Sequence, residues 1–370
     1  MKRSKPTFLD KLMRLIAVLL AIALVLGFLA GRFDPRDYKY IPFFGLAYPF
    51  MLGLNVLMII WWCIRGRWSF ACSTLILILL GWSALSATFG IFGNEGIGPK
   101  ARAEDIRMMT YNVHSFKPYG TDIVDSVKEQ MLDLIQKENP DVICFQEYFT
   151  RRKGPYDITD SLKRILDTRH FYFVPSSDNN YEATGLAIFS KYPIVNKGVI
   201  AFGENFVGNG SIYVDLKIRG QKLRVYNVHL QSISFEKQDY NYLDKVTKKM
   251  DAELVPAKRI ASMLKSAFLK RSAQVDIMKA HMSTCEIPFL VAGDFNDTPA
   301  SYAVTQMTKS MNSTFKAHGS GLGRTYNGKF PNFQIDYIAT TKDIKVHNYR
   351  IIEAQLSDHF PVRSDLSLNP

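Results

Sequence analysis

Three long stretches without a charged side chain constrain the fold of this chain more than any other feature of its sequence. They cover residues 15–31, 41–64 and 68–92. Each falls within the range of about 17 to 25 residues that lets a helix cross a bilayer. Tryptophans near the ends of the second and third stretches suit the headgroup level of a membrane. We therefore predict a membrane anchor over residues 1–92, made of three transmembrane helices rather than a buried helical hairpin.

The distribution of basic residues predicts how these helices are oriented. The N-terminus and the loop 65–67 together carry seven Lys or Arg, whereas the loop 32–40 carries three, offset by two Asp. The positive-inside rule places the N-terminus in the cytoplasm and, after three crossings, residues 93–370 on the other side. For a bacterium this predicts a multi-pass protein of the inner membrane with residues 93–370 in the periplasm. A cleaved signal peptide is the alternative for the first stretch, but no clear small-residue cleavage site follows it.

The net charge of +12 does not by itself indicate nucleic-acid binding. Residues 1–100 hold 11 basic and 4 acidic side chains, whereas residues 101–370 hold 35 and 30. Much of the excess is therefore topology signal, and the second part has no long Lys/Arg tract of the kind that neutralises phosphate backbones. The four cysteines lie in or beside apolar stretches, so we expect small buried hydrophobic side chains rather than a disulfide framework.

Residues 93–103 form a polar, Gly-rich linker, and the sequence that follows alternates apolar runs with amphipathic ones. This pattern predicts a single α/β domain over residues 104–370, with two packed sheets and helices outside them. We expect helices over residues 121–138 and 255–282. Strands are expected over residues 106–113, 141–147, 171–176, 184–190, 194–202, 211–218, 222–230, 288–295, 333–340, 346–353 and 359–368.

The segment 233–258 interrupts this rhythm with closely spaced acidic and basic side chains and several aromatic rings. A solvated helix and loop is one interpretation. A flap that covers a substrate is the other, and the sequence does not decide between them.

Polar side chains end many of the expected strands. Each has an ordinary explanation, because Asn and Asp close turns and a half-buried His is often only a satisfied core residue. Their repetition is the signal, since the ends of different strands meet at one rim, where α/β folds assemble their sites. The residues are Asn112, Glu147, His229, Asp294, Asn296, Asp336, Asp358 and His359.

The motifs TYNVH, CFQE, SKYPI, NVHL, GDFN, QIDYI and SDHFPV occur in this order between residues 104 and 370. Together they resemble the endonuclease/exonuclease/phosphatase superfamily with its deoxyribonuclease I-like fold. The superfamily includes nucleases, neutral sphingomyelinases and inositol polyphosphate 5-phosphatases. The resemblance implies a four-layer sandwich of two mixed β-sheets flanked by helices, which agrees with the strand count above.

The resemblance also implies a metal site at the strand ends. Glu147 is expected to bind Mg²⁺, with Mn²⁺ as an alternative, and Asn112 lies beside it. Asp358 is expected to contribute at the same or a second metal site. Hard cations of this kind take carboxylate and amide oxygens.

Catalytic roles follow from the same resemblance. Asp294 is expected to orient or deprotonate the attacking water, and Asn296 to donate to a nonbridging phosphate oxygen. His359 is expected to stabilise charge on the scissile phosphate while Asp336 holds its ring. His229 is expected near the leaving group or the phosphate. His114 and Lys191 are weak further candidates without an assigned role.

These inferences predict a membrane-anchored, Mg²⁺-dependent phosphoesterase that hydrolyses phosphodiester or phosphomonoester bonds. Nucleic acid, phospholipid and small phosphoesters are all candidate substrates. A sphingomyelinase-like enzyme that cleaves lipid head groups is an alternative to a nuclease, and a membrane module that binds phosphorylated ligands without turnover is a third. Within GDFNDTP we expect Asp294→Ala to abolish activity, whereas Asp297→Ala should mainly cost stability.

Overall fold

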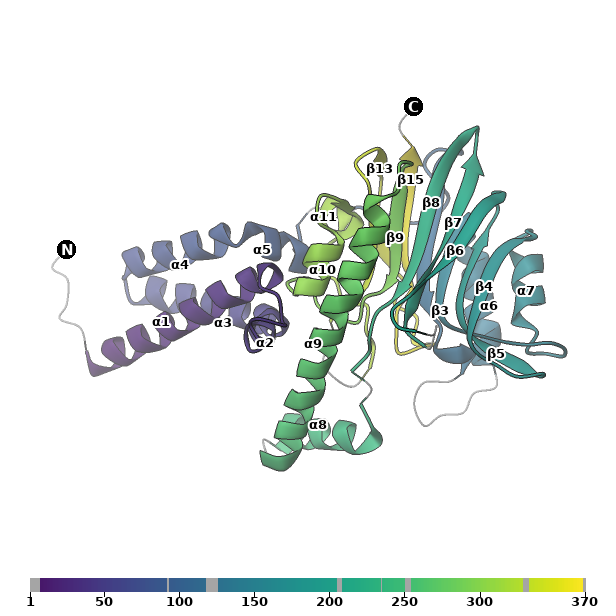
Figure 1. Ribbon diagram of the computed structural model, residues 1–370. Coiled ribbons are helices and arrows are strands. Elements are labelled where there is room, and N and C mark those ends of the chain that lie inside the picture. Colours follow the sequence, from purple (N-terminus) through teal and green to yellow (C-terminus); the bar gives the residue numbers. More distant parts are fainter. Residues whose placement is uncertain are drawn as a thin grey trace. The chain divides into compact units, whose positions relative to one another are not determined.

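The structure is a computed structural model that describes residues 7–91, 93–117, 126–204, 208–233, 235–249, 254–328 and 333–368 (Figure 1). It divides into two compact units. The helical unit comprises Met1–Thr88 together with Thr298–Gln306, and the sheet unit comprises Phe89–Asp297 together with Met307–Pro370.

The helical unit corrects the prediction of three membrane-spanning helices. By length and composition, one described helix can cross a membrane, or two if a bent pair counts as one span. The first expected span forms one helix, but each of the other two is divided. The helices are α1 (Phe8–Leu29), the 3₁₀ turn η1 (Ala30–Arg32), α2 (Ile41–Leu46), α3 (Tyr48–Ile64), α4 (Trp68–Leu80) and α5 (Trp82–Thr88).

Two local features explain these breaks. Pro49 lies in the first turn of α3, where its missing N–H and its ring prevent α2 from continuing as the same helix. The helix over residues 68–92 breaks at Gly81, and α4 and α5 meet there at 77°. Apolar composition alone does not report such breaks, so it overestimates the lengths of the spans.

The segment Thr298–Gln306 packs within the helical unit. Ala300 belongs to an apolar cluster with Leu24 and Tyr48, and the Gln306 side chain donates a hydrogen bond of 2.9 Å to the carbonyl of Gly31. The segment begins directly after Asp297 in the sequence. Cutting the chain at the expected linker would remove the packing partners of this segment, so experiments on this protein require the full chain.

The sheet unit contains two mixed sheets within its described residues. The first has the strand order β10-β12-β9-β8-β7-β6, and the second has the order β13-β15-β2-β3-β5-β4, with β14 paired to β15. Each sheet is mixed because β8 runs parallel to β9 and β2 runs parallel to β3, whereas the other pairs are antiparallel.

The strands of the first sheet are β6 (Ile194–Ala201), β7 (Gly210–Ile218), β8 (Gln221–His229), β9 (Phe289–Asp294), β10 (Asn312–Ser313) and β12 (Asp336–Thr340). Those of the second are β2 (Ile106–Asn112), β3 (Val142–Arg151), β4 (His170–Asp178), β5 (Glu182–Ser190), β13 (Ile344–Val346), β14 (Arg350–Ile351) and β15 (Val362–Leu368). β1 (Phe89–Gly90) pairs separately with β11 (Gly321–Leu322). The strand expected over residues 346–353 is not continuous, since β13 and β14 are separate.

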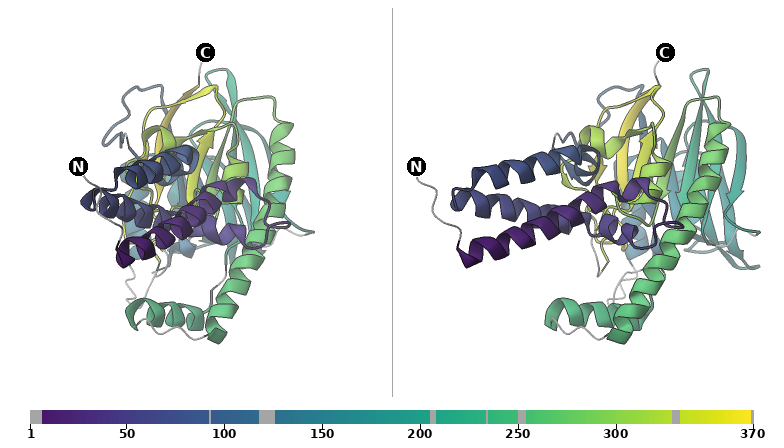
Figure 2. Two further views of the ribbon diagram at one scale, coloured as in Figure 1. Left: turned by 90° about the vertical axis from the view of Figure 1, so that its left-hand side faces the viewer. Right: turned by 60° about the vertical axis from the view of Figure 1, so that its left-hand side comes forward.

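Alternation along the strands builds the layers (Figures 1 and 2). In β3, Val142 and Cys144 belong to the core between the two sheets. Their neighbours Ile143 and Phe145 belong to the cluster that α6 (Val127–Glu138) and α7 (Ile158–Ile165) cover. Successive side chains of a strand point to opposite faces, so one strand serves both cores.

A long helix covers the first sheet, where the His281 ring packs against Tyr226 of β8. This helix is α9 (Leu254–Ser283), close to its expected bounds, and α8 (Lys237–Lys249) precedes it. Of the expected helix 121–138, residues 121–125 lie outside the described part of the chain. The remaining elements are η2 (His114–Phe116), α10 (Tyr302–Met307) and α11 (Thr314–His318).

The cysteines are expected to be small buried hydrophobic side chains. This prediction holds only in part, because Cys144 is buried while Cys72 is exposed.

β2, β8 and β9 carry their polar C-terminal residues to one end of the sheet unit, and Glu147 lies within β3. β15 (Val362–Leu368) starts at this end and finishes at the opposite one (Figure 1). α8 and the N-terminal half of α9 extend beyond the strands on the side of the polar residues. We call this projection the α8–α9 arm.

Candidate active site

Three polar residues lie side by side because their strands are in register. His229 ends β8, Asp294 ends β9 and Asp336 begins β12, and the pairing places His229 opposite Asp294 and Asp294 opposite Asp336. Gly293 allows β8 and β9 to approach closely here. Its φ is 143°, and a Cβ at this position would lie 2.0 Å from the carbonyl oxygen of Val228. The glycine of the GDFN motif therefore serves the backbone geometry of the site.

Asp294 is the centre of this arrangement and is 1% exposed. Its carboxylate accepts hydrogen bonds from the Asn112 side chain at 3.1 Å, from the backbone N–H of Asn296 at 2.8 Å and from the Asn296 side chain at 3.1 Å. Burial raises the pKa of Asp294 to about 6, against the opposing effect of His359 and His229. A carboxylate with such a pKa can accept a proton near neutral pH, as a general base must.

His359 and Asp336 form a buried pair. Nδ1 of His359 lies 3.0 Å and 3.2 Å from the two oxygens of Asp336, and its Nε2 lies 3.7 Å from Asp294. Burial opposes the charge on His359, but the carboxylates of Asp336 and Asp294 outweigh it and hold the pKa of the imidazole well above its usual range. Its surroundings therefore favour the cationic form of the ring.

His229 lies on the other side of Asp294, with Nε2 at 3.6 Å from the carboxylate. The Asn296 side chain donates to the carbonyl of Leu230 at 3.0 Å as well as to Asp294. Both amide hydrogens of Asn296 are thus used within the site. Its expected role as a donor to phosphate requires the exchange of one of these acceptors.

The three expected metal ligands surround His114. Nδ1 of His114 lies 3.5 Å from Glu147 and 3.7 Å from Asp358, and the Asn112 amide lies 3.5 Å from Glu147. Burial raises the pKa of Glu147, but the contact with His114 and the charges of His229 and His359 outweigh it and lower this pKa to about 2. Glu147 is therefore ionised at neutral pH.

Local backbone geometry turns Glu147 toward the site. β3 has an irregularity between Phe145 and Tyr148, and Glu147 has a φ of 49°. An irregularity of this kind re-aims a side chain within a strand.

Two groups of side chains are candidates to hold a divalent cation. Glu147, Asp358 and Asn112 offer the hard oxygen donors that Mg²⁺ prefers. Asp294, Asp336 and His359 have ligand atoms that all lie within 4.8 Å of one another, but the cationic form of His359 has no nitrogen lone pair for a metal ion. The first group is the one that the sequence predicts. The residues present therefore fit a divalent metal ion.

Several residues that lie at the site are given no role by the sequence. His114, a weak candidate, lies between the two expected carboxylate ligands. Ser357 donates to the carbonyl of Asn112 at 2.9 Å and so ties β2 to the segment before β15. Tyr326 packs its ring edge-on against His359 with centroids 5.4 Å apart, and its hydroxyl lies 3.4 Å from that of Tyr240 in α8. Tyr240 of the segment 233–258 is thus connected to the site through Tyr326, while residue 234 and residues 250–253 of this segment lie outside the described part of the chain.

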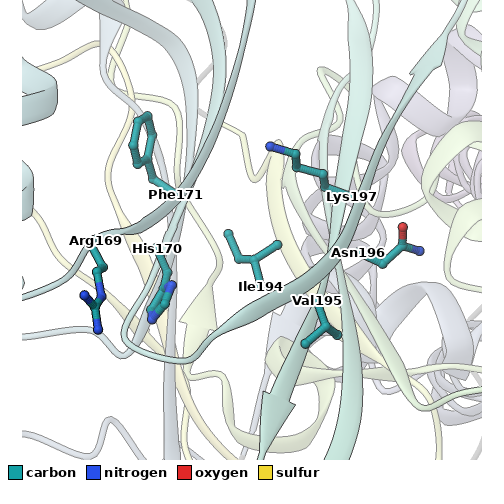
Figure 3. Close-up of a pocket in the computed structure, with 7 residues that line it drawn as sticks. All are labelled: Arg169, His170, Phe171, Ile194, Val195, Asn196 and Lys197. Atoms are coloured by element: carbon teal, nitrogen blue, oxygen red, sulfur yellow. The ribbon is translucent and has the colours of Figure 1, made fainter.

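Lys191 is not part of the site. Its ammonium lies 3.9 Å from Asp141, which immediately precedes β3, at the opposite end from Glu147. A pocket of about 290 Å³ at that same end also lies apart (Figure 3). Arg169 and His170 form one wall of this pocket and point away from Lys197, so the side chains of Arg169 and Lys197 do not converge on one ligand.

Comparisons with known proteins agree with this geometry. Residues 109–249 and 280–359 match the profile of a family described as the Endonuclease/Exonuclease/phosphatase family. A second profile, described as a domain of unknown function, matches residues 10–88. Among curated proteins, none matches the chain.

Solved structures share the fold at low identity. The human Nocturnin catalytic domain with bound sulfate is 19% identical, and the match covers 73% of this chain and 96% of that one with a TM-score of 0.52. A mannosyl-6-phosphatase from Bacteroides thetaiotaomicron is 16% identical, with 71% and 100% covered and a TM-score of 0.51. An endonuclease/exonuclease/phosphatase family protein from the same species is also 16% identical, with 71% and 97% covered and a TM-score of 0.51.

The family profile matches more than half of the chain, and the solved structures share the fold of this protein. The chain belongs to the endonuclease/exonuclease/phosphatase family, whose members hydrolyse phosphoric esters, and it is an enzyme of that class.

Proposed function

We propose that this protein is a membrane-anchored, divalent-metal-dependent hydrolase of phosphodiesters or phosphomonoesters. The observation that carries this proposal is the buried carboxylate of Asp294, with His229 and His359 at 3.6 Å and 3.7 Å. One group that accepts a proton near neutral pH thus adjoins one cationic group that can stabilise phosphate charge. Hydrolysis of a phosphoric ester needs both.

In the proposed mechanism Asp294 takes a proton from the attacking water. Asn296 orients the Asp294 carboxylate through its backbone and side-chain hydrogen bonds. His359, held cationic by Asp336, stabilises the negative charge that develops on the phosphate. His229 lies where it can serve the leaving oxygen or the phosphate.

A divalent ion completes this proposal. Glu147, Asp358 and the Asn112 amide would hold Mg²⁺, and Mn²⁺ is a second possibility by ligand chemistry. The ion supplies neutralisation of phosphate charge when it is bound. The contact of Asn112 with both Glu147 and Asp294 links the ion-binding group to the general base.

Within the proposed anchor, the segment Phe8–Arg32 is long and apolar enough to cross a membrane. Only 11% of the residues in its apolar stretch are buried within the structure. We propose that residues 1–92 form the anchor, that 93–103 form a linker, and that 104–370 form the catalytic domain. One crossing places that domain in the periplasm of a bacterium, whereas two return it to the cytoplasm. Protease accessibility of the domain in spheroplasts distinguishes the two outcomes, and N-terminal sequencing tests cleavage of α1 as a signal sequence.

The substrate class is tested with a panel. Full-length protein in detergent is assayed with Mg²⁺ or EDTA on plasmid DNA, sphingomyelin, bis(p-nitrophenyl) phosphate and p-nitrophenyl phosphate. Sugar phosphates join the panel because the Bacteroides thetaiotaomicron neighbour is a mannosyl-6-phosphatase. We expect at least one ester to be cleaved only with metal. If the wild type cleaves none faster than the Asp294→Asn, His359→Ala double variant, the hydrolase proposal is wrong.

A further inference from the structure

α9 carries a buried arginine that the proposed mechanism does not use. Arg271 is 1% exposed, and it lies in the stretch 250–279 that falls between the two matched parts of the family profile. Burial lowers the pKa of its guanidinium, against the opposing effect of Asp297 and Asp294. A charge buried in this way is stable only where its polar partners are in place.

The partners of Arg271 are the chain segments that follow two catalytic strands. Nη1 donates to the carbonyl of Asn296 and lies 3.4 Å from the carbonyl of Gln231. Nε forms an ion pair of 3.1 Å with the carboxylate of Asp297. One turn further along α9, the Gln274 side chain accepts the backbone N–H of Gln231 at 2.9 Å. Both segments are therefore fastened to the same face of one helix.

These contacts lie close in sequence to two of the proposed catalytic residues. Gln231 is two residues beyond His229, and Asn296 is two residues beyond Asp294. Asn296 also has a φ of 53°, a left-handed conformation that a non-glycine residue keeps only when its surroundings hold it there. Its two side-chain hydrogen bonds to Leu230 and Asp294 depend on this conformation.

We propose that Arg271 is a positioning residue that fixes the spacing of His229 and Asp294 and the conformation of Asn296. The inference rests on the proposed function, since it concerns the efficiency of that same site. The planar guanidinium reaches two carbonyls and one carboxylate at once, which a lysine ammonium cannot reproduce in the same geometry. Asp297 then acts with Arg271 and not only as a turn residue, which revises the expectation that its removal would mainly cost stability.

Two variants of the full-length protein test this inference kinetically. Arg271→Lys keeps the charge and loses the fork, and Asp297→Asn is nearly isosteric and leaves the arginine in place. We expect Arg271→Lys to lower kcat by about 10- to 100-fold with little change in KM, because small misplacements of catalytic groups have effects of this size. Asp297→Asn should give a smaller loss. The double variant should lose little more than Arg271→Lys, since the two residues act through one contact.

Lys270→Ala is the matched control, because this neighbouring side chain of α9 is exposed. It should leave kcat unchanged. All assays are run below the unfolding transition of each variant, so that loss of folded protein does not imitate loss of kcat. If Arg271→Lys and Asp297→Asn lower the unfolding temperature but keep wild-type kcat and KM in the folded state, Arg271 is only structural and the inference fails.

A second readout does not need turnover. Hydrogen exchange of peptides covering residues 226–233 and 289–297 should be faster in Arg271→Lys than in wild type and in Lys270→Ala, while peptides of β2 and β3 stay unchanged. Unaltered exchange in both peptides would overturn the inference even if no substrate had been found. Inactivity of the wild type toward every ester, by contrast, counts against the proposed function.

Discussion

Replacement of Asp336 by Asn is the most direct test of how the site stabilises charge. Asp336 touches His359 through both carboxylate oxygens, at 3.0 Å and 3.2 Å from Nδ1, and both side chains are buried. Asn keeps the shape and one acceptor but removes the negative charge. The imidazole of His359 then loses the carboxylate that does most to hold its pKa well above the usual range.

The size of the effect follows from the kind of interaction. A hydrogen bond to a charged partner contributes about 1.5 to 3 kcal/mol. If that stabilisation is expressed in the transition state, kcat/KM falls by about 10- to 150-fold, at about 1.4 kcal/mol for each factor of ten. Because the folded-state pKa of His359 is raised, its positive charge is lost only as the pH rises through that pKa. Asp336→Asn should therefore move the alkaline limb of the pH profile to lower pH.

The assay is steady-state hydrolysis of the best ester of the panel between pH 5 and about 10, alongside thermal unfolding. Asp215→Asn is the control, since Asp215 pairs with Arg224 at 2.6 Å and 2.9 Å within β7 and β8 and away from the strand ends. We expect it to lower stability and leave kcat/KM intact. Asp336→Asn with kcat/KM within about twofold of wild type and an unmoved alkaline limb would refute the role of His359 as a stabilising cation.

Three further predictions address the base, the backbone and the metal. Asp294 must be ionised to accept a proton, and burial raises its pKa to about 6. We therefore expect kcat/KM to fall about tenfold for each pH unit below about 6. An acidic limb of the pH profile near the pKa of an ordinary Asp would contradict this. Gly293→Ala should destabilise the protein by at least about 2 kcal/mol in urea unfolding, because φ is 143° at this position and an added Cβ would lie too close to the backbone of Val228. Gly203→Ala is the control and should be neutral, since a Cβ there meets open space. Removal of divalent ions with EDTA should abolish activity. Glu147→Gln should weaken Mg²⁺ binding in calorimetry without unfolding the protein. Equal Mg²⁺ binding by this variant and the wild type would exclude Glu147 as a ligand.

Much of the site is predictable because the signal is local. Asp294 and Asn296 follow an apolar strand directly, and Asp358 and His359 precede one, so the chain itself places them at strand ends. The two mixed sheets also follow from apolar runs of strand length. What the sequence does not contain is the register that sets His229 opposite Asp294 and Asp294 opposite Asp336. That register depends on pairing between segments distant in the chain.

The parts that could not be predicted depend on tertiary contacts or on single backbone positions. Arg271 appears as one of many basic residues on a helix, and only the fold shows that it faces the catalytic segments. His114 adjoins Asn112 in sequence, but its position between Glu147 and Asp358 requires the paired strands β2 and β3. In the helical unit, composition indicates the apolar stretches but does not indicate that the second and third of them are divided into shorter helices near Pro49 and Gly81.

The motif GDFND combines residues with opposite effects on stability. Burial raises the pKa of Asp294 from 3.8 to about 6, so the folded protein binds more protons than the unfolded chain in this window, and ionisation of Asp294 lowers stability as the pH rises through it. Asp294→Asn should therefore abolish activity and raise the unfolding temperature at pH 7. Asp297 instead neutralises the buried Arg271, so Asp297→Asn should lower that temperature at every pH where the carboxylate is ionised. If both variants lower the unfolding temperature equally at pH 7, the buried charge of Asp294 does not destabilise the folded protein. A raised pKa of Asp294 would then have to arise from something other than burial.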